Sequence, residues 1–421
     1  MSSMMSIVNG LVFDGVSCEL RLADIQVEDG RIIAVGEPGS TLGDQPGSGP
    51  DPVVIDARGR TVLPGLIDAH CHAYGIDFDA VTTESRPLSY VALKGARRMT
   101  AALHRGFTTV RDPAGGDAGF ARAIAEGLFA APRYLFTGAA LSQTGGHGDG
   151  RAADSDLCGC HAHTAEVVDG VEPLRRAVRE RLRTGAHAVK IMASGGVISP
   201  TDPIRVPQYS PEEIAVVCAE ASRRGSYVAA HAYSPEAIRH AVANGVRSIE
   251  HGNLLDAGTA AFMAERGAYL VATLATYDAM HRLGPGLGLS PLAQAKNSEV
   301  LDAGREAVGI ARAAGVPVGF GTDLMGALDG EQLQGVRLQV EVDGAATALT
   351  SITSVNADLI NRPDLGRIAP GCVADLLIVD GDVLADPSVL WDERRPRSVV
   401  QAGRLLDPEG RETRLTPPPN G

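Results

Sequence analysis

The feature that most restricts the fold of this chain is an alternation of short apolar runs with helical patterns, from Pro64 to about Ala357. Helical spacing of apolar residues is clear in 89–106, 171–185 and 210–225, and such alternation is typical of βα units around a parallel sheet. The apolar runs are GLIDAH, FTTVRD, YLFTGAA, AVKIMA, YVAAHAY, SIEHG, YLVATLA and PVGFGTD. Eight runs predict eight strands, and the span of about 260 residues to Asp323 matches the ~250 residues of a (β/α)8 TIM barrel.

The two ends of the chain follow a different pattern. Residues 5–35 alternate apolar and polar positions with Asn-Gly and Asp-Gly turns, which predicts short antiparallel strands. The segments GRIAPGCVADLLIVDGD and SVVQAGRLLD return to short β-type runs, and we expect them to join the N-terminal strands. The sequence therefore predicts an α/β protein with a composite β-sandwich domain (residues 1–63 plus 361–421) and a (β/α)8 barrel domain (residues 64–360).

Charge and composition limit the partners of the chain. A formal net charge of −13 disfavours nucleic acid and anionic membranes, so a small-molecule substrate is expected. The first 15 residues contain no basic segment and no long apolar run, which predicts neither a signal peptide nor a membrane anchor and favours a cytoplasmic location. Six scattered cysteines do not resemble the framework of a small disulfide-rich fold, and we expect reduced thiols.

Polar residues gather at the carboxyl ends of the predicted strands, the end that carries the active site in a parallel barrel. They are His70 and His72 after the first strand, Lys190 in the fourth, His231 after the fifth, His251 after the sixth and Asp323 after the eighth. The spacing of His70 and His72 places both imidazoles on one side of a strand, within reach of one cation. A single histidine of this kind is usually a core residue, but convergence from five strands predicts a metal site.

Lys190 does not fit a metal site in its ordinary form, because an ammonium group has no lone pair for a cation. Reaction of a neutral, desolvated lysine amine with CO₂ would give an anionic carbamate that can bridge two metal ions. The alternative is a lysine that extends from the barrel rim toward solvent.

With these segments the chain resembles the amidohydrolase superfamily, in particular its binuclear subtype with a carboxylated lysine on the fourth strand. The resemblance covers nearly the whole chain and rests on PGLIDAHCH, FTTVRD, LSQTGGHGD, VKIMASGGVISPTDP, AAHAY, SIEHG, GTD and GRIAPGCVADLLIVDGD. The segments SQTGGHGD and KIMASGGV are similar to the prolidase-like and Xaa-Arg dipeptidase group. Relatives in that group hydrolyse ochratoxin, phenylureas and thiocarbamates such as molinate.

The resemblance implies a role for each candidate residue and a cofactor of two divalent metal ions, with Zn²⁺ expected first. It assigns His70, His72 and Asp323 to the more buried ion, His231 and His251 to the more exposed ion, and carboxylated Lys190 to the bridge. It also implies that His147 and Tyr233 face the scissile carbonyl, where hydrogen-bond donors stabilise a developing oxyanion. Arg205 is a candidate partner for a substrate carboxylate, with a surface position as its alternative.

The expected reaction is hydrolysis of an amide C–N bond, in a dipeptide or an N-acyl amino acid. Two divalent ions about 3.5–4 Å apart make a shared water acidic enough to supply hydroxide at neutral pH, and Asp323 is expected to move its proton to the leaving nitrogen. A carbamate, urea or other xenobiotic amide remains the alternative, because the same site serves all these bonds. The resemblance also suggests a homo-oligomer.

Two other classes of protein are disfavoured. The first is a mononuclear deaminase or cyclic-amide hydrolase, because those deaminases need an H-x-x-E pair after the fifth strand, whereas His231 is followed by Ala-Tyr-Ser. A scaffold without metal would not need the complete ligand set. A C-x-C-H-x-H run at 158–163 is a weak candidate for a second zinc cluster, because its spacing departs from the usual patterns. His104, His187, His240 and His281 are interpreted as structural or surface residues.

Overall fold

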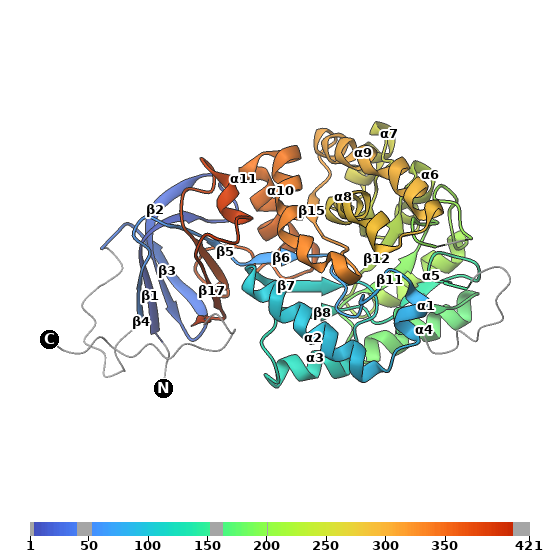
Figure 1. Cartoon of the computed structure of the whole chain (residues 1–421), viewed down its shortest axis with the longest axis horizontal. Coiled ribbons are helices and arrows are strands. Elements are labelled where there is room, and N and C mark those ends of the chain that lie inside the picture. Colours follow the sequence, from blue (N-terminus) through green and yellow to red (C-terminus); the bar gives the residue numbers. More distant parts are fainter. Residues whose placement is uncertain (1–3, 40–52, 152–162, 200, 407–421) are drawn as a thin grey trace.

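The computed structural model of the protein describes residues 4–39, 53–151, 163–199 and 201–406. In Figure 1 a β-rich unit made from both ends of the chain stands beside a larger α/β unit, in which helices surround a ring of strands. The prediction of an α/β fold with a TIM barrel and a small β domain is confirmed.

Each of the eight apolar runs contains a parallel strand. These strands are β6 (Leu66–Asp68), β7 (Phe107–Asp112), β8 (Arg133–Phe136), β11 (Val189–Met192), β12 (Val228–Ala232), β13 (Ser248–His251), β14 (Tyr269–Ala272) and β15 (Val318–Phe320). Two short strands that were not predicted, β9 (Ala140–Ser142) and β10 (Ala165–Val167), extend the sheet beside β11. All these strands pair in parallel, so their carboxyl ends lie on one rim.

Backbone hydrogen bonds close the strands into a barrel. The amide of Ala69, after β6, donates to the carbonyl of Phe320 in β15 at 3.0 Å, and the amide of Asp323 donates to the carbonyl of His70 at 2.7 Å. On the other side, the amide of His187 donates to the carbonyl of Phe136 in β8 at 2.7 Å, just before β11. The same bonds that close the barrel therefore hold His70 beside Asp323.

Twelve α-helices connect and cover the strands within the described residues. They are α1 (Ala80–Glu84), α2 (Leu88–His104), α3 (Ala118–Ala125), α4 (Val171–Arg183), α5 (Pro211–Ser222), α6 (Pro235–Ala243), α7 (Ala257–Glu265), α8 (Leu274–Leu283), α9 (Pro291–Ala313), α10 (Gln332–Asp343), α11 (Ala345–Thr350) and α12 (Asn356–Leu359). The three helical stretches expected from the sequence correspond to α2, α4 and α5.

A serine followed by a proline starts three of these helices. The side chains of Ser210, Ser234 and Ser290 each accept a hydrogen bond from the amide three residues later. A serine hydroxyl satisfies one of the amides that a helix start leaves free, and proline fits the next position because its missing N–H is not needed there. This local signal fixes where α5, α6 and α9 begin.

The β-rich unit joins both ends of the chain in one eight-stranded sheet. Its strands are β1 (Met4–Phe13), β2 (Leu20–Glu28), β3 (Arg31–Gly36), β4 (Val53–Asp56), β5 (Thr61–Pro64), β16 (Leu376–Val379), β17 (Arg397–Gln401) and β18 (Arg404–Leu405). The predicted junction is present, because β16 pairs antiparallel with β5. The first three strands are antiparallel as expected, whereas β4 and β5 run parallel to β1. Buried side chains of β1, β2, β3, β5, β16 and β17 form its core.

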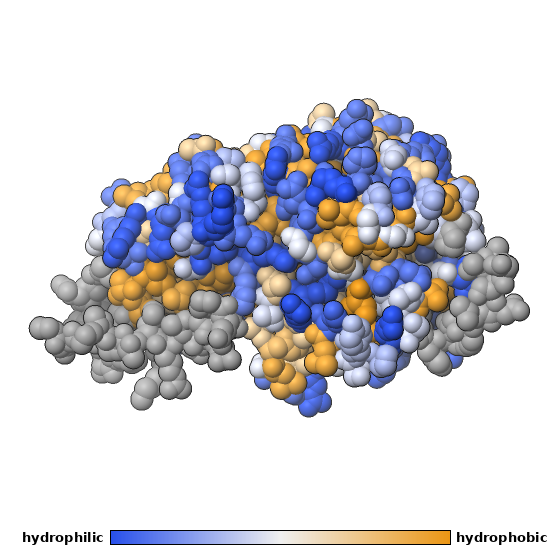
Figure 2. All heavy atoms as spheres, in the orientation of Figure 1, coloured by the Kyte–Doolittle hydropathy of each residue, from blue (hydrophilic) through white to orange (hydrophobic). Residues whose placement is uncertain are grey.

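The surface of the molecule differs between the two units. Figure 2 shows mixed polar and apolar side chains over the helices, and a larger apolar area on the β-rich unit. Large apolar side chains of that unit that are 42–60% exposed are Val16, Leu22, Ile33 and Val54. Among the described residues, no helix has both the length and the apolar character needed to cross a membrane.

Candidate active site

A cavity of about 170 Å³ opens at the carboxyl ends of the barrel strands. Eight of the nine predicted site residues line it, namely His70, His72, His147, Lys190, His231, Tyr233, His251 and Asp323. The barrel therefore brings together side chains that are up to about 250 positions apart in the sequence.

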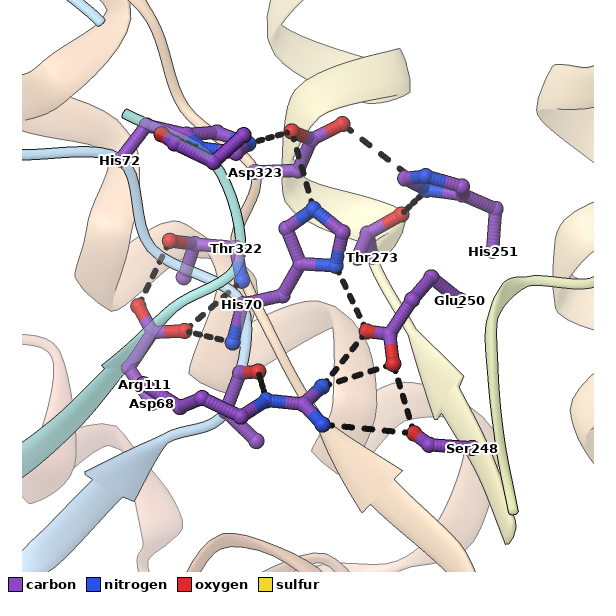
Figure 3. Close-up of polar contacts among 12 residues, drawn as sticks. Asp68, His70, His72, Arg111, Ser248, Glu250, His251, Thr273, Thr322 and Asp323 are labelled. Atoms are coloured by element: carbon purple, nitrogen blue, oxygen red, sulfur yellow. Dashed lines mark hydrogen bonds and ion pairs between the residues drawn. The ribbon is translucent and has the colours of Figure 1, made fainter. Parts of the chain in front are cut away.

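Asp323 and three of the histidines meet at separations suited to metal binding. Asp323 Oδ1 lies 2.9 Å from His72 Nε2 and 3.4 Å from His70 Nε2, and its Oδ2 lies 3.8 Å from His251 Nδ1 (Figure 3). Ligand atoms about 2.1 Å from one metal ion lie roughly 3–3.5 Å from each other. Candidate ligand atoms of His70, His251 and Asp323 all lie within 4.8 Å of one another. The donor set therefore fits a divalent metal ion.

In each of the four histidines, one ring nitrogen is held by an acceptor of the protein. His70 Nδ1 contacts Glu250 at 2.7 Å, His72 Nδ1 contacts the Ala114 carbonyl at 3.2 Å, His231 Nε2 contacts the Gly195 carbonyl at 3.0 Å, and His251 Nδ1 contacts Thr273 at 2.8 Å. Such second contacts orient histidines that bind metals and fix their tautomer. The other ring nitrogen of His70 and of His72 lies within 3.4 Å of Asp323 Oδ1 and so faces the candidate metal position.

Glu250 connects the histidines to the centre of the barrel. It accepts two hydrogen bonds of 2.7 Å from Arg111 and one of 2.6 Å from Ser248, and all three side chains are fully buried (Figure 3). Burial alone would raise the pKa of Glu250, but Arg111 and His70 hold it far below its usual range. The carboxylate therefore stays ionised and holds the proton of His70 on Nδ1.

A second buried carboxylate, Asp68, fixes the backbone on both sides of the barrel closure. It accepts hydrogen bonds from the amides of His70 and Thr322 at 3.1 Å and from the Thr322 hydroxyl at 2.6 Å. These bonds hold the residues next to Asp323 against the end of β6, where His70 lies.

Two of the candidate ligands have an unusual backbone. His251 and Asp323 have φ angles of 74° and 53°, in the left-handed region that residues with a Cβ rarely adopt. Strained conformations of this kind concentrate at functional sites, where the surrounding structure holds them.

Burial also sets the protonation of the remaining candidates. It lowers the pKa of His231 and His251 well below the usual value, so both rings are neutral, the form that binds a cation. It lowers the pKa of Lys190 to about 8. Lys190 is 2% exposed, and none of the described residues forms a hydrogen bond with its amine. The amine of Lys190 is therefore desolvated.

His147 and Tyr233 lie directly beside the candidate ligands His231 and His251. The ring of His147 stacks on His231 with a centroid distance of 4.2 Å and an interplanar angle of 21°. The Tyr233 hydroxyl lies 2.7 Å from the Tyr277 hydroxyl. Burial raises the pKa of both tyrosines, so both remain neutral hydroxyl groups that can donate hydrogen bonds.

The rest of the cavity wall is largely apolar. It includes Phe78, Met192, Val197, Ile198, Met280 and Met325, and the carboxylates of Asp77 and Asp79 also lie along it. Among the described residues that line the cavity, Lys190 is the one lysine and there is no arginine. A substrate group away from the polar cluster therefore meets mainly hydrocarbon.

The structure does not bring Arg205 into this cavity. Its guanidinium pairs with Glu299 at 2.9 Å, and its side chain is 60% exposed. The loop turns the side chain outward to a partner on α9, so Arg205 takes the surface position that the sequence left as its alternative. Of the candidate second zinc cluster, residues 158, 160 and 161 lie outside the described residues.

Several residues of the site were not found from the sequence: Asp68, Arg111, Glu250, Thr273 and Tyr277. A weak signal exists for two of them, because an arginine in FTTVRD and a glutamate in SIEHG are charges inside apolar strands. A buried charge requires a partner, and the two charges are partners of each other.

The barrel and its cluster of histidines and a carboxylate define a metal-dependent hydrolase. The chain belongs to the Amidohydrolase family, which matches residues 61–406. It is 44% identical to a solved amidohydrolase, with a TM-score of 0.90 over 96% of this chain and 99% of that chain. A solved prolidase in complex with N-methylphosphonate-L-proline is 42% identical, with the same TM-score and coverage. An ochratoxinase from Aspergillus niger is 32% identical over 95% of this chain and 86% of that protein.

Proposed function

We propose that this amidohydrolase hydrolyses the amide bond of a dipeptide or an N-acyl amino acid, with two divalent metal ions and a carboxylated Lys190. The observation that carries the proposal is the cavity in which four histidines, each held through one ring nitrogen, lie around Asp323 and a buried lysine. The similarity to a prolidase that was solved with a proline analogue supports the dipeptide class.

The residues that would hold the metal ions are His70, His72, His231, His251, Asp323 and carboxylated Lys190. Divalent ions in such a site supply positive charge that polarises a scissile carbonyl and makes water acidic enough to attack it at neutral pH. A carbamate on Lys190 would replace a buried positive charge by a negative one, which offsets the charge of the two cations.

The protein's own groups would bind the substrate and move its protons. Burial would raise the pKa of Asp323, but His70 and His72 hold it well below its usual range. Asp323 is therefore an ionised acceptor, 14% exposed, that can take a proton from water and deliver it to the leaving nitrogen. His147 and Tyr233 would donate hydrogen bonds to the carbonyl oxygen as negative charge develops there.

The alternative function is hydrolysis of a carbamate, a urea or another xenobiotic amide at the same site. Identity of 32% to an ochratoxinase favours a substrate of this kind, as does the apolar part of the cavity wall. Both functions need the same metal ions and proton transfers, and they differ in the group beside the scissile bond.

The experiment that tests the proposal combines metal analysis with a substrate panel. Metal per chain is measured, and the wild type, Lys190→Ala and the surface control Lys94→Ala are assayed with metal and bicarbonate on dipeptides, N-acyl amino acids, carbamates and ureas. About two ions per chain and dipeptide hydrolysis that Lys190→Ala alone abolishes are the expected results. Two ions with activity confined to carbamates or ureas would select the alternative function, and a metal-free active protein would overturn both.

Two further predictions stay open to test. The first is a cytoplasmic location. A homo-oligomer is proposed from the family resemblance, and light scattering of the purified protein measures it.

A further inference from the structure

Lys296 on α9 holds the loop that follows β11. Its ammonium donates three hydrogen bonds to backbone carbonyls of this loop, to Gly196 at 2.9 Å, Ser199 at 2.8 Å and Asp202 at 2.9 Å. A lysine ammonium has three donors, so all of them are used. The helix and the loop are thereby joined at one point, although they lie about 100 residues apart in the sequence.

This contact places a charge where it is poorly solvated. The side chain of Lys296 is 14% exposed, and the nearest carboxylate oxygen, Asp202 Oδ1, is 4.0 Å away. Burial lowers the pKa of Lys296. A buried charge is costly unless its hydrogen bonds are satisfied, so this ammonium depends on the loop carbonyls as much as the loop depends on it.

The choice of lysine at this position is informative in this chain. Only three of its 38 basic residues are lysines, at positions 94, 190 and 296. Arginine carries its donors in a planar fork, whereas lysine concentrates three donors on one atom. Three carbonyls that converge on a single point therefore require the amine.

The three residues held by Lys296 are the same three that fix His147. His147 Nδ1 lies 2.8 Å from the Ser199 hydroxyl and 3.5 Å from Asp202 Oδ2. Gly196 packs against the imidazole so closely that a Cβ there would lie 2.0 Å from His147 Cε1. These contacts occupy one ring nitrogen and one ring face and leave Nε2 for a ligand.

The loop reaches the candidate metal ligands as well. Gly195, next to Gly196, accepts the hydrogen bond of 3.0 Å from His231 Nε2, and the His147 ring stacks on His231. The position of the loop thus determines how these two imidazoles lie relative to each other at the cavity wall.

We propose that Lys296 is a positioning residue of the hydrolytic site, which acts through the loop carbonyls on the orientation of His147. Its charge never touches the substrate, because Lys296 does not line the cavity. The proposal rests on the proposed function, since it requires that His147 contacts the substrate.

The first test compares Lys296→Met with Lys94→Met, which removes the same charge from an exposed position on α2. Lys296→Met is expected to lower kcat by about 10- to 100-fold with a smaller change in KM, because a misplacement of about 1 Å can cost about 100-fold. Lys94→Met is expected to behave as the wild type. Lys296→Arg keeps the charge and loses the convergent geometry, so it is expected not to restore kcat.

A double-mutant cycle with His147→Ala shows whether the effect passes through His147. If Lys296 acts through this ring, the double variant loses no more activity than His147→Ala alone. Additive losses, or full activity of Lys296→Arg, would overturn the proposal. Should Lys296→Met not fold, Lys296→Arg replaces it in the cycle, because it also loses the convergent geometry.

Hydrogen exchange tests, without any substrate, whether Lys296 holds the loop after β11. Lys296→Met is expected to speed exchange of the amides of His147 and Gly196, which are bonded to Gln208 and Asp202, and Lys94→Met is not. Unchanged exchange would show that Lys296 does not hold this loop, which would overturn the proposal. Faster exchange in a protein that hydrolyses none of the tested amides would confirm that Lys296 holds the loop and would reject the proposed function.

Discussion

The two sides of the cavity are supported in different ways. The side proposed to bind metal, formed by His70, His72, His251 and Asp323, is supported from inside the barrel by the fully buried pair of Arg111 and Glu250. The side proposed to bind substrate, formed by His147, Tyr233 and Tyr277, is supported from outside the barrel. There, the neighbouring residues Lys296 and Asn297 of α9 hold the loop after β11 and the backbone carbonyl of Tyr277.

Substitutions on the two sides should therefore have different effects. Groups held by buried strand residues cannot move unless the barrel is disturbed, so substitutions there should alter stability and metal content together. Groups held by loops and a helix can shift while the barrel stays intact. Substitutions there should alter turnover more than stability, and metal content should change only where the loop contacts His231, through the Gly195 carbonyl.

The largest effect is expected from Arg111→Met on the metal side. It leaves the Glu250 carboxylate buried without its charge partner, which should lower the free energy of unfolding by about 3–5 kcal/mol. Denaturant unfolding measures this change. Arg122→Met is the matched control, because the Arg122–Glu126 pair is exposed and such pairs contribute about 0–1 kcal/mol. An equal decrease in the free energy of unfolding of both variants would show that the buried pair does not support the metal side more than a surface pair does.

Tyr233→Phe should produce the largest change in turnover. Loss of one donor to a developing oxyanion lowers kcat by about 100-fold, and metal content should not change. Tyr277→Phe should have a smaller effect that is not additive with it, because the two hydroxyls lie 2.7 Å apart. Loss of metal in Tyr233→Phe would assign this tyrosine to the metal side.

Thr273→Val should weaken metal binding by about 10-fold. The Thr273 hydroxyl contacts His251 Nδ1 at 2.8 Å, and removal of such an outer contact lowers metal affinity about 10- to 100-fold. Competition with a chelator measures the affinity. Turnover of the fully loaded variant should stay near that of the wild type, and a large loss of kcat at saturating metal would contradict this assignment.

Arg205→Ala should have the smallest effect on stability and on KM, because Arg205 lies outside the cavity. Its exposed pair with Glu299 contributes no more than about 1 kcal/mol to stability, and KM should not change for substrates with or without a free carboxylate. A rise in KM confined to substrates with a carboxylate would restore Arg205 as a binding residue.

The fold and the metal side were largely predictable because their signals are local. Each barrel strand lies in an apolar run of five to seven residues, and each candidate ligand lies in or just after its run, as His231 and His72 do. Strand direction then brings these residues to one rim without any knowledge of packing. The parallel pairing of β4 and β5 with β1 was missed, since alternation predicts strands but not their direction.

The supporting residues were not predictable for a physical reason. Glu250 has a role because Arg111 of β7 and His70 after β6 reach it across the barrel. Lys296 lies in a helix whose sequence gives no sign of the loop that it contacts. The direction of Arg205 depends on the path of its loop. Each of these contacts depends on three-dimensional packing between distant segments.

The pairing of β5 with β16 determines the order in which this chain can fold. It joins Val62 to Ile378 and Leu63 to Leu377, so more than 300 residues must be synthesised between the two partners. A nascent chain therefore carries an unpaired edge of β5 through synthesis of the whole barrel, and an exposed strand edge promotes aggregation. Closure of this sheet is a long-range event that cannot begin until β16 has been synthesised.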